Sequence, residues 1–83
     1  MTEAIKNSIK HDFVKKRTNL RRLRLANEIT VDQMAKAINV SSRQYSLKER
    51  GKYPFKDYEM LIIAEIFNMT VQKLFFEWLF IYD

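Results

Sequence analysis

The chain has 83 residues, a length that allows one domain with a modest core. It contains no cysteine and a single histidine, His11, which excludes disulfides, thiolate metal sites and cysteine nucleophiles and leaves an imidazole that cannot build a metal site or a triad alone. The net charge of +5, with one glycine and one proline, indicates a basic and almost entirely helical domain with short connections.

Residues 1–17 are expected to form a basic N-terminal extension with an amphipathic helix. Ile5, Ile9 and Phe13 lie four residues apart, as on one face of a helix. The basic run Lys15-Lys16-Arg17 follows. This run can act as an arm on a DNA backbone or in a groove, and a solvated helix face is an equally good reading.

A second helix is predicted from Thr18, as its cap, to Asn27. Leu20 and Leu23 are expected to face inward from it. The pattern leaves open whether this helix is separate from the preceding one or forms one bent helix with it.

Residues 30–51 carry the most informative pattern of the chain, two short helices joined by a tight turn. Thr30 is a suitable N-cap for the first helix. Asn39 tolerates the left-handed conformation that ends a helix. The apolar residues between them follow the i, i+3, i+4, i+7 spacing of one helical face: Val31, Met34, Ala35 and Ile38.

The second helix of this pair is predicted over residues 42–50. Val40 is an apolar residue inside the turn, and Ser41 can cap the helix that follows. Gly51 is well placed just beyond the end of the helix. Two helices joined by so short a turn make a helix-turn-helix, whose second helix can enter the major groove of DNA.

A further helix is predicted over residues 57–67, after Tyr53-Pro54, because the residue before a proline disfavours the helical conformation. Asp57 and Glu59 suit its first turn. The helix is apolar on most sides, so we expect it to be the most buried one. Its apolar residues are Leu61, Ile62, Ile63, Ala64, Ile66 and Phe67.

The last helix is predicted over residues 71–83, after a turn, Asn68-Met69-Thr70, that repeats the pattern of Asn39-Val40-Ser41. Its continuous apolar stripe consists of Val71, Leu74, Phe75, Trp78, Leu79 and Tyr82. An 83-residue core cannot readily cover all of this surface, so we expect dimerisation through Phe76, Trp78, Leu79, Phe80, Ile81 and Tyr82. The alternative is that the stripe closes the core of one chain.

Charge is distributed unevenly along the chain. Residues 1–27 carry eight Lys or Arg against two acidic residues, residues 30–56 carry six against two, and residues 57–83 carry one against five. A basic N-terminal part and an acidic C-terminal part suit a protein that presents one side to a polyanion. Simple solvation of helix surfaces explains the same charges without a partner.

The sequence also indicates what the protein does not do. No carboxylate pair lies beside His11 or a nucleophile in a recognisable motif, and no glycine-rich phosphate loop is present, so we expect no enzyme, no cofactor and no metal. The longest apolar cluster is too short and too interrupted by charge to span a bilayer. Lys6, Lys10 and Asp12 break any core of a signal peptide. We therefore expect a cytoplasmic protein without a membrane partner.

Seven short sequence pieces lie in a fixed order between residues 19 and 76. They are Leu20-x-x-Leu23-Arg24, Ile29-Thr30, Met34-Ala35, Ile38-Asn39-Val40-Ser41, Glu49-x-Gly51-Lys52, Ile63-Ala64 and Leu74-Phe75. As an ordered set they resemble the Cro/CI-type phage repressors, or XRE family of helix-turn-helix regulators. The resemblance covers residues 19–76 and implies a compact five-helix, lambda-repressor-like all-α bundle with room for an extra N-terminal helix. Residues 1–83 as a whole are expected to form a single domain.

The resemblance also implies which residues contact DNA bases. Arg43 is the sharpest candidate, because a guanidinium can donate two hydrogen bonds to guanine O6 and N7; a phosphate contact is its alternative. Leu47 departs from the polar residue common at its position, and it can meet a thymine methyl or pack inward. The full set of base-contact candidates is Ser42, Arg43, Gln44, Ser46 and Leu47.

Phosphate contacts are implied at the start of the first helix of the pair and in the loop after the second. The candidates are Thr30, Gln33, Lys52, Tyr53 and Lys56. The family further implies a structural ion pair between Arg24 and Glu49 and a core position for Tyr45. Lys48 stands where many members have Ile, Leu or Trp, and we expect its stem to pack while its ammonium reaches solvent.

These features together indicate a sequence-specific double-stranded DNA-binding transcriptional regulator, a repressor or Cro-like protein acting at operator DNA as a homodimer. The alternative is a protein-interaction module, an antitoxin or adaptor, that holds a protein partner on its C-terminal aromatic face.

Overall fold

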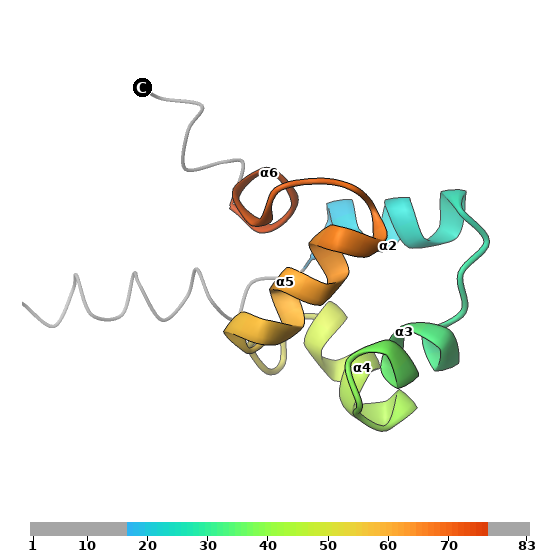
Figure 1. Cartoon of the computed structure of the whole chain (residues 1–83). Helices are drawn as coiled ribbons and strands as arrows, with labels where there is room; N and C mark the ends of the chain where they lie inside the picture. Colours follow the sequence, from blue (N-terminus) through green and yellow to red (C-terminus); the bar gives the residue numbers. More distant parts are fainter. Residues whose placement is uncertain (1–16, 77–83) are drawn as a thin grey trace, which may run out of the picture.

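The protein, seen in a computed structural model that describes residues 17–76, has five α-helices and no strand in that range (Figure 1). The helices are α2 (Thr18–Ala26), α3 (Val31–Ala37), α4 (Ser42–Glu49), α5 (Asp57–Ile66) and α6 (Val71–Phe75). The all-α class predicted from the sequence is confirmed. The last predicted helix ends earlier than expected, because α6 stops at Phe75 and Phe76 leaves the helical conformation as its C-cap. The predicted helix with Ile5, Ile9 and Phe13, and the residues after Phe76, lie outside the described residues.

Three of the helices begin at a hydroxyl residue, as the sequence predicts. The side chains of Thr30, Ser41 and Thr70 each accept the backbone N–H three residues further on, at 3.1 Å. Gln33 and Gln44 complete two capping boxes, because each Oε1 accepts the backbone N–H of its own cap at 2.8 and 3.0 Å. Each cap contributes about 1 kcal/mol, so the starts of α3, α4 and α6 are locally specified.

The same turn ends α2, α3 and α5. In Glu28-Ile29-Thr30, Asn39-Val40-Ser41 and Asn68-Met69-Thr70, the first residue has a positive φ of 57°, 59° and 53°. The N–H of the apolar second residue donates to the carbonyl five residues earlier at 2.9 Å, and the third residue caps the next helix. The sequence predicts the two turns that begin with Asn. It does not predict the turn at Glu28, because a glutamate seldom adopts positive φ.

The start of α2 differs from the sequence prediction. Arg17, not Thr18, occupies the N-cap, and it makes no side-chain cap. Its backbone N–H donates to the Glu49 carbonyl at 3.0 Å, and its Nη1 donates to the Phe75 carbonyl at 2.9 Å. The guanidinium lies 5.4 Å from the Phe75 ring centroid and 5.6 Å from that of Phe76. Arg17 is therefore buried and fastens α2 to the ends of α4 and α6, which removes it from the predicted DNA arm; Lys15 and Lys16 lie outside the described residues.

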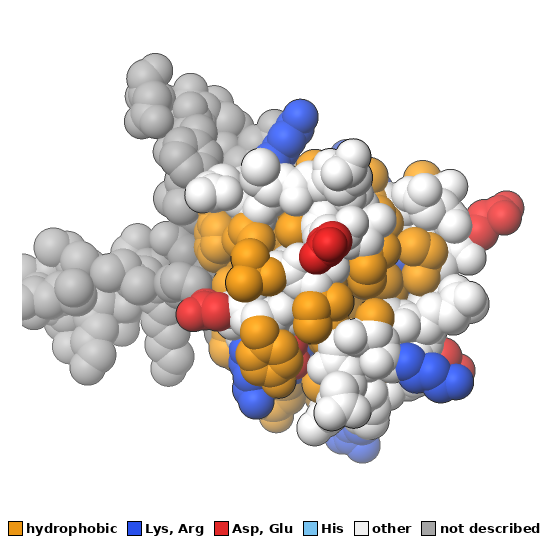
Figure 2. Space-filling model, in the orientation of Figure 1, with side chains coloured by type: hydrophobic (Ala, Val, Ile, Leu, Met, Phe, Trp, Pro, Cys, Tyr) orange, Lys and Arg blue, Asp and Glu red, His pale blue; other side chains and the backbone are white. Residues whose placement is uncertain are grey.

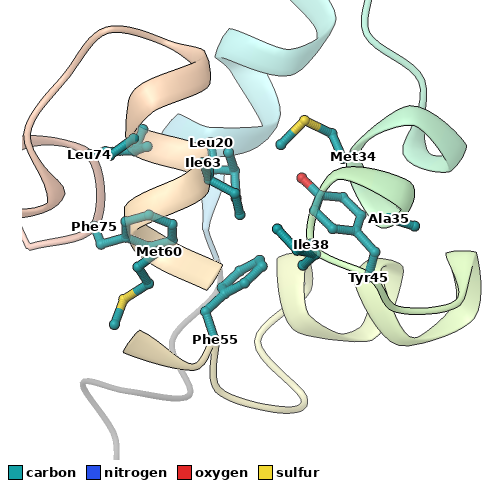
Figure 3. Close-up of a cluster of buried hydrophobic side chains, with 11 residues drawn as sticks. Leu20, Met34, Ala35, Ile38, Tyr45, Phe55, Met60, Ile63, Leu74 and Phe75 are labelled. Carbon is teal, nitrogen blue, oxygen red and sulfur yellow. The ribbon is translucent and has the colours of Figure 1, made fainter. Parts of the chain in front are cut away.

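The core contains side chains from every described helix and from the loop before α5 (Figure 3). Its buried members are Leu20, Met34, Ala35, Ile38, Tyr45, Phe55, Met60, Ile63, Ala64, Leu74 and Phe75. Phe55, from the loop before α5, packs edge-to-face on Tyr45 at 6.0 Å and on Phe75 at 5.4 Å between ring centroids. This ring series joins α4 to α6 and holds the loop after α4 against the domain.

Helix α5 has four buried residues, more than any other described helix, as the sequence predicts, but one of its sides is open. It packs against α3 and α6 through Met60, Ile63 and Ala64, whereas Leu61 and Ile66 are exposed. In the sequence, apolar residues occur on most sides of this helix, so their spacing does not distinguish the packed side from the open side. Within residues 17–76, no helix combines the length and apolar character needed to cross a bilayer.

Candidate nucleic-acid interface

Helices α3 and α4 pack on each other and are joined by four residues, Ile38 to Ser41, in the helix-turn-helix arrangement. Ala35 is almost completely buried, and its small side chain permits a close approach of the two helices. Helix α4 turns Tyr45, Lys48 and Glu49 inward. Its other face is therefore open, and all five predicted base-contact residues lie outside the core.

That open face borders a groove of about 490 Å³ between α4 and the following loop. The groove is lined by Arg43, Gln44, Leu47, Lys48, Tyr53, Pro54 and Lys56. It brings three predicted base-contact residues together with two predicted phosphate-contact residues. Lys52 is exposed in the same loop. Leu47 is half-buried in the groove wall rather than packed in the core.

Arg43 lies in the first turn of α4 with its side chain exposed. It makes no hydrogen bond or ion pair with any residue between 17 and 76, so its five N–H donors are free for a ligand. Ser46 is half-buried on the same helix.

The N-terminal turns of α3 and α4 lie side by side. The Ser42 hydroxyl donates to the Asp32 carboxylate, which links the two turns directly. This bond brings the start of α3, with Thr30 and Gln33, next to the start of α4 and its base-contact candidates. Ser42 thus already has a protein partner in Asp32, and Thr30 has one in its own cap, where its hydroxyl accepts the Gln33 N–H.

Gln33 and Gln44 have a structural role that the family resemblance did not imply. Each side-chain oxygen is used in a capping box, while each amide NH₂ remains available as a donor. The signal was present in the sequence as Thr30-x-x-Gln33 and Ser41-x-x-Gln44. The two roles are compatible, because the cap uses only the amide oxygen and both side chains are exposed.

The Arg24–Glu49 pair that the resemblance implies is present and buried. Arg24 Nε donates to Glu49 Oε2 at 2.9 Å and Nη2 to Oε1 at 3.0 Å, a bidentate arrangement. Arg24 Nη1 also donates to the Ile29 carbonyl at 3.1 Å, and the Tyr45 hydroxyl donates to Glu49 Oε2 at 2.7 Å. This network ties α2, its following turn and the end of α4 together, and so sets the orientation of α4.

The network shifts two pKa values. The hydrogen bond to Glu49 raises the pKa of the Arg24 guanidinium above its ordinary value. Burial, together with the hydrogen bond to Glu49, raises the pKa of the Tyr45 hydroxyl well above its ordinary value of 10.0. The folded chain therefore holds the Tyr45 proton at pH values at which the unfolded chain releases it.

Stability should consequently fall at alkaline pH. The contribution of Tyr45 is complete below the unfolded pKa near 10.0. Above that pH it should decline by about 1.4 kcal/mol per pH unit, because only the unfolded chain loses the proton. Urea unfolding of the wild type and of Tyr45→Phe between about pH 9 and 11.5 measures this decline. The upper limit of that range is about 1.5 pH units above the ordinary pKa of a tyrosine. The variant should lack the Tyr45 part of the slope; two parallel curves would contradict the assignment.

Lys48 forms a second buried ion pair, which the sequence did not indicate. We expected its ammonium in solvent, but Nζ lies 2.5 Å from Oε1 of the fully buried Glu59. A buried carboxylate needs a cation, and among residues 17–76 Lys48 supplies it. The same Oε1 accepts the Lys56 backbone N–H at 2.8 Å, whereas Glu59 Oε2 has no partner among the described residues. Glu59 thereby anchors both α4 and the loop that forms the far wall of the groove.

The predicted dimerisation surface is only partly described. Phe76 is half-buried, and its ring centroid is 6.5 Å from that of Phe75. The other candidates, Trp78, Leu79, Phe80, Ile81 and Tyr82, lie outside the described residues. Within residues 17–76, no cluster of His, Asp or Glu side chains could hold a metal ion.

Comparison with family models, with curated proteins and with solved structures gave no match for this chain. The resemblance to the Cro/CI-type regulators therefore stays a prediction from the sequence pieces quoted above.

Proposed function

We propose that this chain is a sequence-specific double-stranded DNA-binding regulator of transcription, of the phage or bacterial repressor or Cro-like type. It acts in the cytoplasm of a bacterial cell or phage-infected host, at operator DNA and as a homodimer. Helix α4 enters the major groove, Arg43 reads a base edge, and the loop after α4 holds the phosphate backbone. The observation that supports this most is the free Arg43 side chain on a groove that it shares with Tyr53 and Lys56.

The exposed charges favour a polyanion as the ligand. Eight Lys and Arg side chains of the described residues are exposed: Arg21, Arg22, Lys36, Arg43, Arg50, Lys52, Lys56 and Lys73. Only four acidic side chains are exposed there: Glu28, Asp32, Asp57 and Glu65. The remaining acidic residues, Glu49 and Glu59, are buried in ion pairs and do not offset the surface charge. DNA, with a regular array of phosphates, complements such a surface.

Salt dependence tests the basic surface. If about six phosphates are neutralised, the logarithm of the association constant should fall against the logarithm of salt concentration with a slope of about −5. Titrations of a labelled duplex with the full chain between 50 and 300 mM salt, a range of about sixfold, measure it. Lys52→Ala should make the slope less steep by about 1, because one phosphate contact is lost. A flat slope would exclude the basic surface as the binding site.

A protein-interaction module, such as an antitoxin or adaptor, is the second candidate. The cluster of apolar and aromatic residues in the sequence between positions 76 and 82 favours it, because such residues are typical of contacts with a protein partner. Arg43→Ala separates the two functions. Under the first proposal it removes specific DNA binding, and under the second it leaves partner capture unchanged.

A further inference from the structure

The outer side of α5 is an apolar surface that neither the groove nor the core uses. Tyr58, Leu61, Ile62 and Ile66 are exposed by 53%, 62%, 36% and 41%. Figure 2 shows hydrophobic side chains gathered over the part of the surface that α5 forms, with an acidic side chain between them. Four large apolar side chains on one short helix are more than scattered surface hydrophobicity, and such a patch indicates an interaction site.

A carboxylate, Glu65, lies among these apolar residues near the C-terminal end of the patch. Glu65 is seven residues after Tyr58, so the two lie two turns apart on nearly the same line along the helix. Leu61 and Ile62 lie between them. Glu65 makes no ion pair with any described residue, and the Tyr58 hydroxyl makes no hydrogen bond in the same range. A partner that covers the patch must give Glu65 a donor, because a buried carboxylate without one is costly.

We propose that the outer side of α5 is the surface on which a second copy of this chain docks, with the two α5 helices antiparallel about a two-fold axis between Leu61 and Ile62. Positions 58 and 65 are equally distant from that axis. The antiparallel pair therefore sets each Tyr58 hydroxyl opposite Glu65 of the second copy, while Leu61 and Ile62 stack across the axis. The patch supplies its own missing donor, which is the self-complementarity that a two-fold interface requires.

This inference rests on the proposed function, because it names the surface through which the two copies of the proposed homodimer are in contact. It places that contact on α5, apart from the C-terminal segment predicted from the sequence. Other occupants of the patch, such as the stripe of Ile5, Ile9 and Phe13 from the same chain, are outcomes that the test below separates.

Sedimentation of the full chain tests the surface. The wild type should sediment at twice the 10.0 kDa chain mass. Leu61→Glu should shift it to the mass of one chain and raise the dimer dissociation constant at least about a hundredfold, because the two-fold axis places two unpaired carboxylates in the contact. The control is Leu25→Glu, at a leucine of α2 with similar exposure, 50%; it should remain dimeric. Circular dichroism should show both variants folded, since both positions are exposed.

The absence of cysteine allows a second, direct measurement. Packed helices lie about 8–10 Å apart at their axes, so side chains beside the two-fold axis are within reach of a disulfide. Ile62→Cys should give a cross-linked dimer under mild oxidation, and Leu25→Cys should not. Tyr58→Phe should weaken association about tenfold, since both copies lose the donor to Glu65.

Two results would overturn the inference. One is a wild type that sediments as a single chain, as expected if residues 1–16 of the same chain cover the patch. The other is a Leu61→Glu variant that remains dimeric, which places the contact elsewhere. Arg43→Ala should leave the dimer mass unchanged. An α5-dependent dimer that shows no preference among DNA sequences would refute the proposed function and leave the interface standing.

Discussion

Replacing Glu49 with alanine should lower the free energy of unfolding by about 3–5 kcal/mol, because the change leaves a buried guanidinium without its anion. Arg24 loses both hydrogen bonds of its bidentate pair, and the Tyr45 hydroxyl loses its acceptor. A chain of this length has a total stability of about 4–12 kcal/mol, so the variant should lose a quarter or more of its stability. Urea denaturation followed by circular dichroism measures the difference.

A double variant, Arg24→Met with Glu49→Leu, serves as the control for this prediction. It removes both charges and keeps apolar volume, so it should recover most of the stability lost in Glu49→Ala. A loss below about 1 kcal/mol in Glu49→Ala would place the pair among exposed ion pairs of little energetic value. The bidentate, buried geometry would then not be what orients α4.

Replacing Arg43 with alanine should weaken binding to the operator by about 30-fold to 10⁴-fold. A bidentate arginine–guanine contact contributes about 1–3 kcal/mol of base discrimination, and a homodimer loses two such contacts. The fold should be unaffected, because Arg43 is exposed and makes no hydrogen bond or ion pair with another described residue. Affinities for the operator and for a scrambled duplex, measured at one salt concentration, give the effect.

The matched control is Arg22→Ala, at an exposed arginine of α2 that lies outside the groove of α4. It removes the same charge, so it should weaken both duplexes slightly and equally. If Arg43→Ala also weakened both duplexes equally, Arg43 would hold a phosphate and would not read a base. If it changed neither affinity, α4 would not be the DNA-contacting helix.

The helix boundaries of this domain follow closely from local sequence signals. Thr30, Ser41 and Thr70 cap helices as predicted, and Asn39, Asn68 and Gly51 adopt positive φ where the sequence requires a stop. These outcomes depend on side chains within a few residues of each other, so a single sequence contains the information. The open face of α4 follows from the same signals, because Tyr45 fixes which side of the helix turns inward.

The features that the sequence did not predict depend on partners distant along the chain. Lys48 and Glu59 are eleven residues apart in different helices, and nothing in their local pattern indicates that they meet. Arg17 belongs to a basic run by sequence but is buried against Phe75, 58 residues away. The apolar residues of α5 likewise could not reveal which side is packed, since that depends on where α3 and α6 lie. The spacing of apolar residues predicts where a helix forms, whereas the burial of each side depends on which other helices pack against it.

The central claim, sequence-specific DNA binding, is tested most directly by fluorescence anisotropy of the full wild-type chain. The labelled duplexes are one enriched by the protein from a random pool and a scrambled duplex of the same composition, at physiological salt. We expect tighter binding to the enriched duplex by about a thousandfold or more, the range of specific protein–DNA complexes. Failure to enrich any sequence, with equal and weak binding to both duplexes, would contradict the proposal and favour a protein partner instead.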